Sequence, residues 1–311
     1  MWVNRDIEHL TLGVHSGLTI GAFDGVHLGH QALIRAMVAG AHAKGLQAVV
    51  LTFDPLPRQV FSHGENELLS TLEERITLME PLGVDGVIVL PFDREVAATP
   101  AADFVSWLVD ALALRGLWVG PDFTLGHNHE GDIPFLTTMG AHRGFAVHIF
   151  DETVLWEGHP ARSSRIRRAV RSGDLRQANG CLGRPYQLAG IVRHGDARGH
   201  TLGFPTANLD TPPGRLRPAN GIYICRAHLP QGSFDALTNV GTRPTFDHRP
   251  PTVEAYLLDF TGNIYGEPLR LDFLHRLRPE FRFPSAEALI VQMQTDEMDA
   301  RVWLHEQHKQ A

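Results

Sequence analysis

Two histidines three residues apart lie in a glycine-rich segment near the start of the chain. His27 and His30 belong to residues 21–30, which read Gly-Ala-Phe-Asp-Gly-Val-His-Leu-Gly-His. An apolar run precedes this segment and a helical pattern follows it, so the sequence predicts strand, loop and helix. Backbone N–H groups of such a loop, together with the start of its helix, favour an anion. We expect both imidazoles to donate to one phosphate group, although an isolated pair would suit two solvated histidines on an exposed turn.

A second candidate group is a basic, hydroxyl-containing segment at residues 162–167, Arg-Ser-Ser-Arg-Ile-Arg. Serine hydroxyls and guanidinium groups at a helix start suit a triphosphate, because both donate hydrogen bonds to phosphate oxygens. A run of positive charge at a helix N-terminus is unfavourable without an anion. The alternative is an amphipathic helix whose basic face is solvated.

A third candidate is Glu254, which lies in an apolar segment among Val253, Tyr256, Leu257 and Leu258. A carboxylate on a strand that packs a core is costly unless it is paired or used. Glu254 is therefore a candidate functional residue, the alternative being an outward-facing glutamate on an edge strand.

The elements around these groups predict two domains. In the first half, apolar runs alternate with helical periodicities, which is typical of β-α-β units and a parallel sheet. We expect strands at 18–20, 48–53, 86–90, 117–119 and 145–150, with helices at 71–82 and 101–114 among others. The second half has short β-rich runs broken by glycine and proline, including 187–192, 221–227, 236–240 and 253–260, and then a helix from 285 to about 305. This pattern predicts a doubly wound parallel α/β domain at 1–183 and a small antiparallel β-barrel with a terminal helix at 184–311.

Composition narrows the function classes. The chain has 311 residues, a net charge of -7, 43% hydrophobic residues and two cysteines. The acidic balance argues against a nucleic-acid partner, and no apolar run is long enough for a membrane span. No signal peptide is evident, so we expect a cytoplasmic protein. Lysine occurs only at positions 44 and 309, neither within a Walker A loop.

The segment at 21–30 resembles G-x-F-D-G-x-H-x-G-H, the signature of the adenylyltransferase module of prokaryotic bifunctional riboflavin kinase/FAD synthetases. That module belongs to the nucleotidyltransferase superfamily. The resemblance implies that His27 and His30 steady phosphate oxygens during adenylyl transfer. The nucleotide-binding residues that it implies in this segment are Gly21, Phe23, Asp24 and Gly29.

Two more segments extend this resemblance. Residues 162–167 are similar to S-S-T-R-I-R, with Arg162 replacing the first serine, and residues 119–126 are similar to V-G-x-[DN]-F-x-F-G. The first match implies that ATP is bound by Ser163, Ser164, Arg165 and Arg167. The second implies that Asp122 and Phe123 face the flavin, although an Asp after Pro also suits a turn that bonds its own backbone. A third segment, 52–58, departs from the family's F-[DE]-P-H-P at Leu56.

The C-terminal half resembles riboflavin kinase. Residues 190–208 are similar to G-x-V-x-x-G-x-x-x-G-R-x-L-G-F-P-T-A-N, with His200 in place of arginine. The match implies that Gly203 binds nucleotide and that Thr206 and Asn208 bind Mg²⁺, which accepts hard oxygen ligands beside ATP phosphates. Segments 239–246 and 252–260 match N-x-G-x-R-P-T-F and T-x-E-x-x-L-L-D-F, and the second match makes Glu254 the base on the ribityl 5′-hydroxyl.

The resemblance thus implies two reactions: riboflavin and ATP give FMN, and FMN and ATP then give FAD and pyrophosphate, with Mg²⁺ as cofactor. Three alternatives remain at this stage. The first is that only one of the two modules is active. The second is a protein similar to a class I aminoacyl-tRNA synthetase, and the third is a protein that binds a metal through His27, His30, His127 and His129. The sequence does not indicate an oligomeric state.

Overall fold

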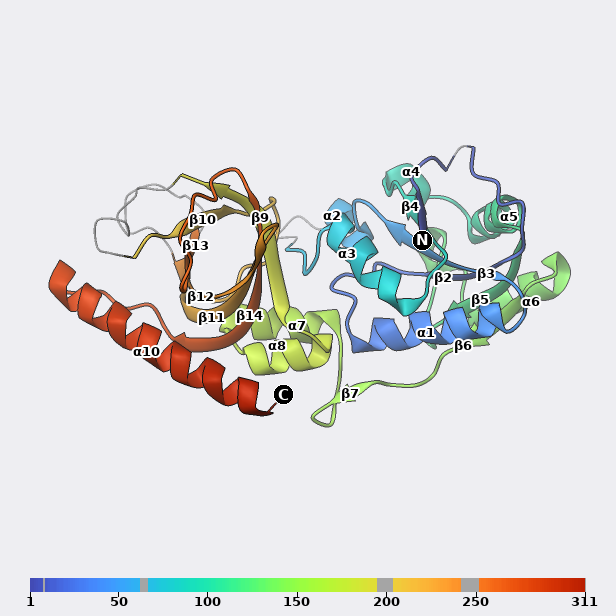
Figure 1. Cartoon of the computed structure of the whole chain (residues 1–311). Helices are drawn as coiled ribbons and strands as arrows, with labels where there is room; N and C mark the ends of the chain where they lie inside the picture. The colour runs from blue at the N-terminus through green and yellow to red at the C-terminus, as the bar shows by residue number, and fades with distance from the viewer. Residues whose placement is uncertain (8, 62–66, 195–203, 242–251, 311) are drawn as a thin grey trace. The chain divides into compact units, whose positions relative to one another are not determined.

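The computed structural model describes residues 1–7, 9–61, 67–194, 204–241 and 252–310 (Figure 1). The chain divides into two compact units, Met1–Ser163 and Ser164–Ala311. None of the helices in the described ranges has both the length and the apolar character needed to cross a bilayer.

The first unit is built on a six-stranded parallel sheet with the strand order β1-β4-β3-β2-β5-β6. Its strands are β1 (Trp2–Asn4), β2 (Ser16–Ile20), β3 (Gln47–Phe53), β4 (Gly86–Leu90), β5 (Leu114–Val119) and β6 (Ala146–Ile149). Its helices are α1 (Leu28–His42), α2 (Pro57–Phe61), α3 (Leu72–Met79), α4 (Arg94–Ala97), α5 (Ala101–Leu112) and α6 (Ile133–Arg143), with short 3₁₀ turns at Glu80–Leu82 and His127–His129 and a small hairpin of β7 (Leu155–Trp156) and β8 (His159–Pro160).

The side chains of β3 point alternately to two buried clusters, which explains why helices cover both faces of this sheet. Val49 and Leu51 join the buried cluster that includes residues of α5 and α6. Ala48 and Val50 join a second cluster that includes residues of α1 and α3. Successive side chains of a strand point to opposite faces, so an apolar run buried on both sides requires a layer of helices on each. The predicted doubly wound α/β domain is confirmed.

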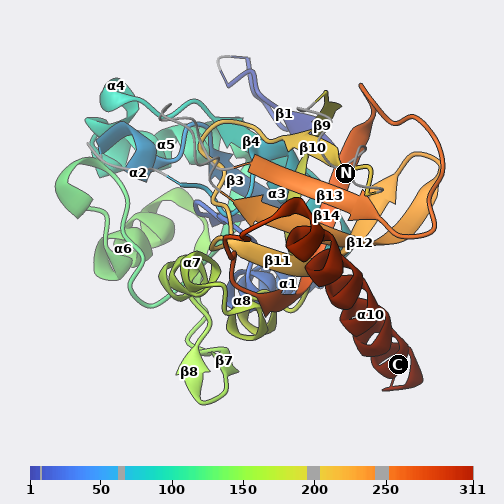
Figure 2. The ribbon, with the colours of Figure 1, turned by 90° about the vertical axis from the view of Figure 1, so that its left-hand side faces the viewer.

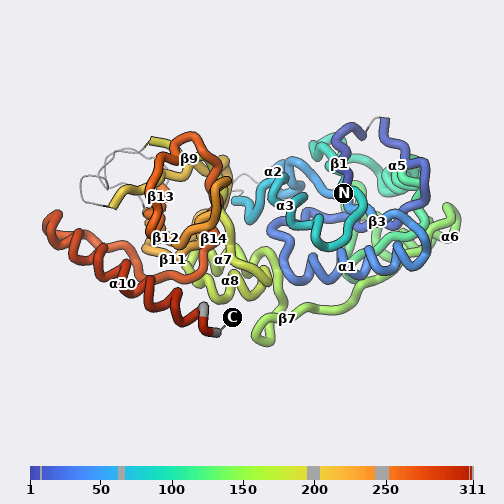
Figure 3. The backbone as a smooth tube through the Cα atoms, in the orientation of Figure 1, coloured from blue at the N-terminus to red at the C-terminus, as the bar shows by residue number. Residues whose placement is uncertain are grey.

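The second unit begins with α7 (Ser163–Ser172, of which Ser163 still belongs to the first unit) and α8 (Leu175–Leu182). A closed antiparallel barrel follows, with the order β10-β13-β12-β11-β14-β9, visible as a ring in Figure 3. Its strands are β9 (Tyr186–Arg193), β10 (Ala207–Asp210), β11 (Gly221–Leu229), β12 (Gly232–Gly241), β13 (Thr252–Leu257) and β14 (Pro268–Arg278). The predicted barrel is confirmed.

Helix α10 (Ala286–Gln310) runs beside the barrel strands (Figure 2). Ala300 and Leu304 of α10 form a buried cluster with Ile224 of β11 and Leu237 of β12. Strand residues that alternate with these, such as the fully buried Cys225, point to the barrel interior. One face of these strands therefore fills the barrel, and the other packs against α10.

Some boundaries differ from those predicted. Helix α5 ends at Leu112 rather than at 114, because Ala113 adopts the left-handed conformation with φ 45° and Leu114 already belongs to β5. Strand β13 ends at Leu257 rather than at 260, before Asp259 with φ 56°. The predicted division at 183/184 follows the end of α8 and stays a prediction.

Candidate functional sites

Residues 21–27 connect β2 to α1, at the edge of the sheet where doubly wound folds bind ligands, and residues 28–30 begin α1. His27 is the N-cap of α1, and its Nδ1 accepts a hydrogen bond from the His30 backbone N–H at 3.3 Å. The two imidazole rings stack with centroids 3.5 Å apart and an interplanar angle of 22°. The structure thus brings both predicted histidines together at the positive end of a 15-residue helix, an arrangement that suits a phosphate.

Close packing fixes these imidazoles. A Cβ at position 29 would lie 3.2 Å from Cε1 of His27, so glycine allows the imidazole to lie against the first turn of the helix. Phe23 and Val26 both have positive φ, 47° and 39°, and both side chains are buried. Left-handed backbone is unfavourable for such residues and is retained where the surrounding packing determines it. The Phe23 ring also meets the His30 ring edge-on, with centroids 5.2 Å apart.

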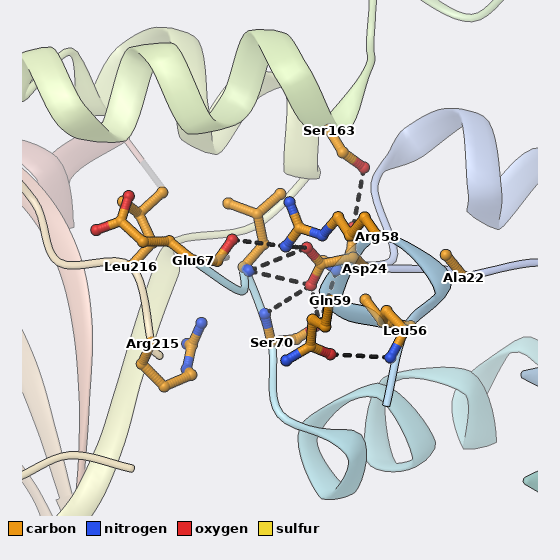
Figure 4. A network of polar contacts seen from close by, with 12 residues as sticks. Ala22, Asp24, Leu56, Arg58, Gln59, Glu67, Ser70, Ser163, Arg215 and Leu216 are labelled. Atoms are coloured by element: carbon orange, nitrogen blue, oxygen red, sulfur yellow. Dashed lines mark hydrogen bonds and ion pairs between the residues drawn. The ribbon is translucent and has the colours of Figure 1, made fainter. Parts of the chain in front are cut away.

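The buried carboxylate of Asp24 ties this loop to the segment before α3 (Figure 4). It accepts hydrogen bonds from the backbone N–H groups of Leu69 and Ser70, each at 3.0 Å, and it pairs with Arg58 Nη2 at 2.9 Å. The Ser70 hydroxyl in turn accepts from the N–H of Gly25 at 2.7 Å. These contacts give Asp24 a role in shaping the loop, and its predicted contact with nucleotide stays a prediction.

The predicted triphosphate residues lie at the start of α7. The Ser163 hydroxyl donates to the carbonyl oxygen of Asp24 at 3.1 Å, which attaches the first residue of α7 to the loop between β2 and α1. Ser164, Arg165 and Arg167 belong to the second unit, where Ser164 is exposed and both arginines are half-buried. Their role toward the phosphates of ATP therefore stays a prediction.

A cavity of about 890 Å³ lies at the carboxyl ends of the parallel strands of the first unit. Gly21, Phe53, Leu90 and other residues that end or follow strands form part of its wall. Its aromatic wall consists of Phe53, Phe61, Phe92, Phe104 and Phe123. Its polar wall consists of Arg58, Arg94, Thr99, Thr124, His127, Asn128 and His129. This mixture suits a large, flat, partly polar ring system.

Of the two predicted flavin residues, Phe123 lines this cavity, whereas Asp122 is exposed and does not. Sequence reasoning considered His127 and His129 only as metal ligands, and the structure places both in the cavity wall. Among the described residues, no group of three or more His, Cys, Asp or Glu side chains is placed to hold a metal ion.

In the barrel, Glu254 lies on β13 between two amides. It is directly opposite Asn208 of β10 on one side and Asn239 of β12 on the other. Strand β13 is paired on both edges, so the alternative of an edge strand is wrong. Residues opposite one another in an antiparallel pair share a face. The three polar side chains therefore share one face of the sheet, the face that carries Leu237 and Tyr256 toward α10.

A cavity of about 320 Å³ lies against this face and includes Glu254, Asn239 and Thr206 in its wall. Tyr256 also lines it, and burial raises the pKa of its phenol, with the Glu297 carboxylate adding to the effect. Tyr256 is thus a neutral hydrogen-bond donor at neutral pH. Gly203, the predicted nucleotide-binding glycine, lies outside the described residues.

The opposite wall of this cavity comes from α10 and the segment that follows β14. Arg278 donates to both carboxylate oxygens of Asp296, at 2.8 and 2.6 Å, and Gln292 donates to the same carboxylate at 2.9 Å. The guanidinium lies over the rings of Phe281 and Phe283, at 5.1 and 5.8 Å from their centroids. Sequence reasoning missed this pair. The available signal was Asp296 on the apolar stripe of α10 that also carries Ala300 and Leu304.

A histidine pair at a helix N-terminus beside one cavity, and a carboxylate between two amides beside another, define a two-module enzyme of phosphate-group transfer. Residues 14–165 match the FAD synthetase family, and residues 182–304 match the riboflavin kinase family. The chain belongs to the bifunctional riboflavin kinase/FMN adenylyltransferase family.

Bacterial members of this family are similar over nearly their whole length. The chain is 36% identical to the bifunctional riboflavin kinase/FMN adenylyltransferase of Haemophilus influenzae over 292 residues, which cover 93% of this chain and 94% of that protein. The Escherichia coli K12 protein of the same name is 34% identical over 302 residues, 96% of each chain. A crystal structure titled macrolide-efflux protein, from Streptococcus pneumoniae, superposes with a TM-score of 0.88 at 29% identity, covering 96% of this chain and 98% of that one.

Proposed function

We propose that the first unit adenylylates FMN and that the barrel phosphorylates riboflavin, so that one chain makes FAD from riboflavin and two ATP. The observation that carries this division is the presence of a chemically distinct cavity in each matched region. The histidine pair and the aromatic cavity lie within residues 14–165. Glu254 and the barrel cavity lie within residues 182–304.

In adenylylation, an oxygen of the FMN phosphate attacks the α-phosphorus of ATP. The new P–O bond forms as the bond from the α-phosphorus to the bridging oxygen breaks, and pyrophosphate leaves with that electron pair. Such a transfer needs positioning and charge neutralisation more than covalent participation of the protein. His27 and His30 stabilise the phosphate oxygens from the start of α1. The aromatic cavity holds the flavin ring.

In the kinase reaction, the 5′-hydroxyl of riboflavin attacks the γ-phosphorus of ATP and ADP leaves. The carboxylate of Glu254 accepts the hydroxyl proton as the phosphoryl group arrives. The oxygen-bearing side chains of Asn208 and Thr206 suit Mg²⁺, and register pairing places Asn208 directly opposite Glu254. When bound, this ion neutralises charge on the ATP phosphates. These two residues would therefore hold the metal beside the base.

We also infer that the chain acts in the cytoplasm. The chain has only two cysteines, Cys181 and Cys225, which are too few for a disulfide framework and fit a reducing compartment.

The test is a time course with purified protein, riboflavin, ATP and Mg²⁺, in which the three flavins are separated and quantified. FMN should appear first and FAD should follow, with no conversion when ATP is omitted or the metal is chelated. Riboflavin left unphosphorylated, together with supplied FMN left unadenylylated, would contradict the proposal.

A further inference from the structure

One polar group in the wall of the barrel cavity has no role in the reactions as written above. Asn239, on β12, is half-buried and lines the cavity beside Glu254. Its Oδ1 is out of reach of water and accepts no hydrogen bond from any residue that the structure describes. A buried acceptor left unpaired is costly, so an amide in this position usually has a partner.

The neighbours of Asn239 indicate what kind of partner it takes. Glu254 is directly opposite it on β13, and Ile222 is directly opposite it on β11. Side chains in such positions have Cβ atoms about 4.5–5.5 Å apart and share a face. The amide therefore lies next to the base on one side and next to an apolar side chain on the other. A ligand group that reaches Asn239 also lies close to the atom that Glu254 deprotonates.

We propose that Asn239 binds the 4′-hydroxyl of the ribityl chain and thereby orients riboflavin so that its 5′-hydroxyl meets Glu254. This inference rests on the proposed kinase function of the barrel. Rotation of the amide exchanges Oδ1 and Nδ2, so a ligand hydroxyl in the cavity, which both donates and accepts, can pair with either group. Two hydroxyls on adjacent carbons, each within hydrogen-bonding distance of its own side chain, match the spacing of neighbouring residues across two strands.

This assignment distinguishes Asn239 from the groups around it. Asp296 and Arg278, across the cavity, satisfy each other. Glu254 is assigned to the reacting hydroxyl, and Asn208 lies on its other side, toward the proposed metal site. Asn239 is thus the amide placed for the hydroxyl next to the reacting one.

The experiment combines Asn239→Leu, which keeps the volume and removes the polar atoms, with riboflavin and 4′-deoxyriboflavin as substrates. Wild-type kcat/KM should fall about tenfold when the 4′-hydroxyl is absent, the fold-change expected from one lost hydrogen bond. Asn239→Leu should lose about tenfold with riboflavin and show no further loss with the deoxy substrate. Asn239→Ser, which restores a hydroxyl, should recover part of the loss.

Two controls separate this result from a structural effect. Asn263→Ala, in an exposed loop between β13 and β14, should leave both substrates unaffected. Adenylylation of supplied FMN should be unchanged in every variant, and calorimetric unfolding should show that the barrel of each variant is folded. Two results would overturn the inference. In one, Asn239→Leu loses a further factor of about ten in kcat/KM when the 4′-hydroxyl is removed from the substrate; in the other, Asn239→Leu has the wild-type kcat/KM with riboflavin. A wild-type enzyme that does not phosphorylate riboflavin would instead overturn the proposed function.

Discussion

The buried ion pair between Asp296 and Arg278 is expected to stabilise the barrel unit and the wall of its cavity. The two side chains are only 5% and 12% exposed, and both nitrogen–oxygen contacts are short, at 2.8 and 2.6 Å. Asp296→Asn keeps the shape of the side chain and removes its charge, which leaves a guanidinium buried without its counter-ion. Breaking a buried pair in this way typically costs about 3–5 kcal/mol. For a unit of roughly 150 residues, that corresponds to a fall in Tm of about 6–20 °C.

The chain provides a matched control on the same helix. Arg301 of α10 donates to both carboxylate oxygens of Asp259, each at 2.8 Å, but these side chains are 44% and 74% exposed. Exposed pairs contribute little even when their geometry is good, so Asp259→Asn should unfold close to wild type. Asparagine also tolerates the positive φ of 56° at this position.

The assay is calorimetric unfolding of the full chain, combined with both activities measured at 25 °C. Asp296→Asn should lower the Tm of the barrel unit and raise KM for riboflavin, while adenylylation of FMN persists. Equal Tm values for Asp296→Asn and Asp259→Asn would refute the claim that burial makes the first pair the stronger one.

Two further predictions follow from the second unit. Burial raises the pKa of Tyr223 to about 12, so stability should fall as pH rises from about 10, where the unfolded phenol ionises, to about 12. The free energy of unfolding, measured with denaturant at pH 9 and pH 11, should fall less between these two pH values in Tyr223→Phe than in the wild-type protein. An equal fall in the two proteins would contradict the prediction. A fragment starting at Ser164 should have a higher Tm than one starting at Arg184, because the shorter fragment loses the two side-chain hydrogen bonds of Asn179 to barrel strands, at 2.9 and 2.8 Å. Equal Tm values would show that α7 and α8 do not stabilise the barrel.

The layers of the fold could be predicted from the sequence because buried apolar residues recur with the period of the helix or strand that carries them. The continuous apolar run of β3 indicates a strand covered on both faces, and helical covers on both sides were found. Short elements leave less trace: β1 has three residues, of which Val3 is exposed, and it was not predicted. Helix α5 was predicted two residues too long, because its apolar periodicity continues into β5 through Ala113.

Site residues were predicted where their type departs from their surroundings. Glu254 is acidic within an apolar strand. His27 and His30 are three residues apart on one helical face, so their proximity follows from the local sequence alone. Asp24 was predicted to bind nucleotide, whereas the structure shows its contacts with Leu69 and Ser70, more than forty residues away. Contacts of that kind depend on chain topology, which a motif does not record. The Arg278–Asp296 pair was missed for the same reason.

The central claim, two chemistries at two separate sites of one chain, is tested most directly by mixing two variants. Glu254→Gln should slow riboflavin phosphorylation by about 10²–10⁴-fold through loss of the base, while it still adenylylates supplied FMN. His30→Ala should slow FAD formation by about 10²–10³-fold through lost phosphate stabilisation, while it still makes FMN. Neither variant alone should convert riboflavin to FAD at an appreciable rate.

An equimolar mixture of the two variants with riboflavin, ATP and Mg²⁺ should restore FAD formation, because FMN released by His30→Ala diffuses to the intact adenylylation site of Glu254→Gln. FAD is quantified over time in the mixture and in each variant alone. Restoration in the mixture is the predicted result. Either folded variant losing both activities, with no FAD from the mixture, would contradict separate sites and indicate one shared site.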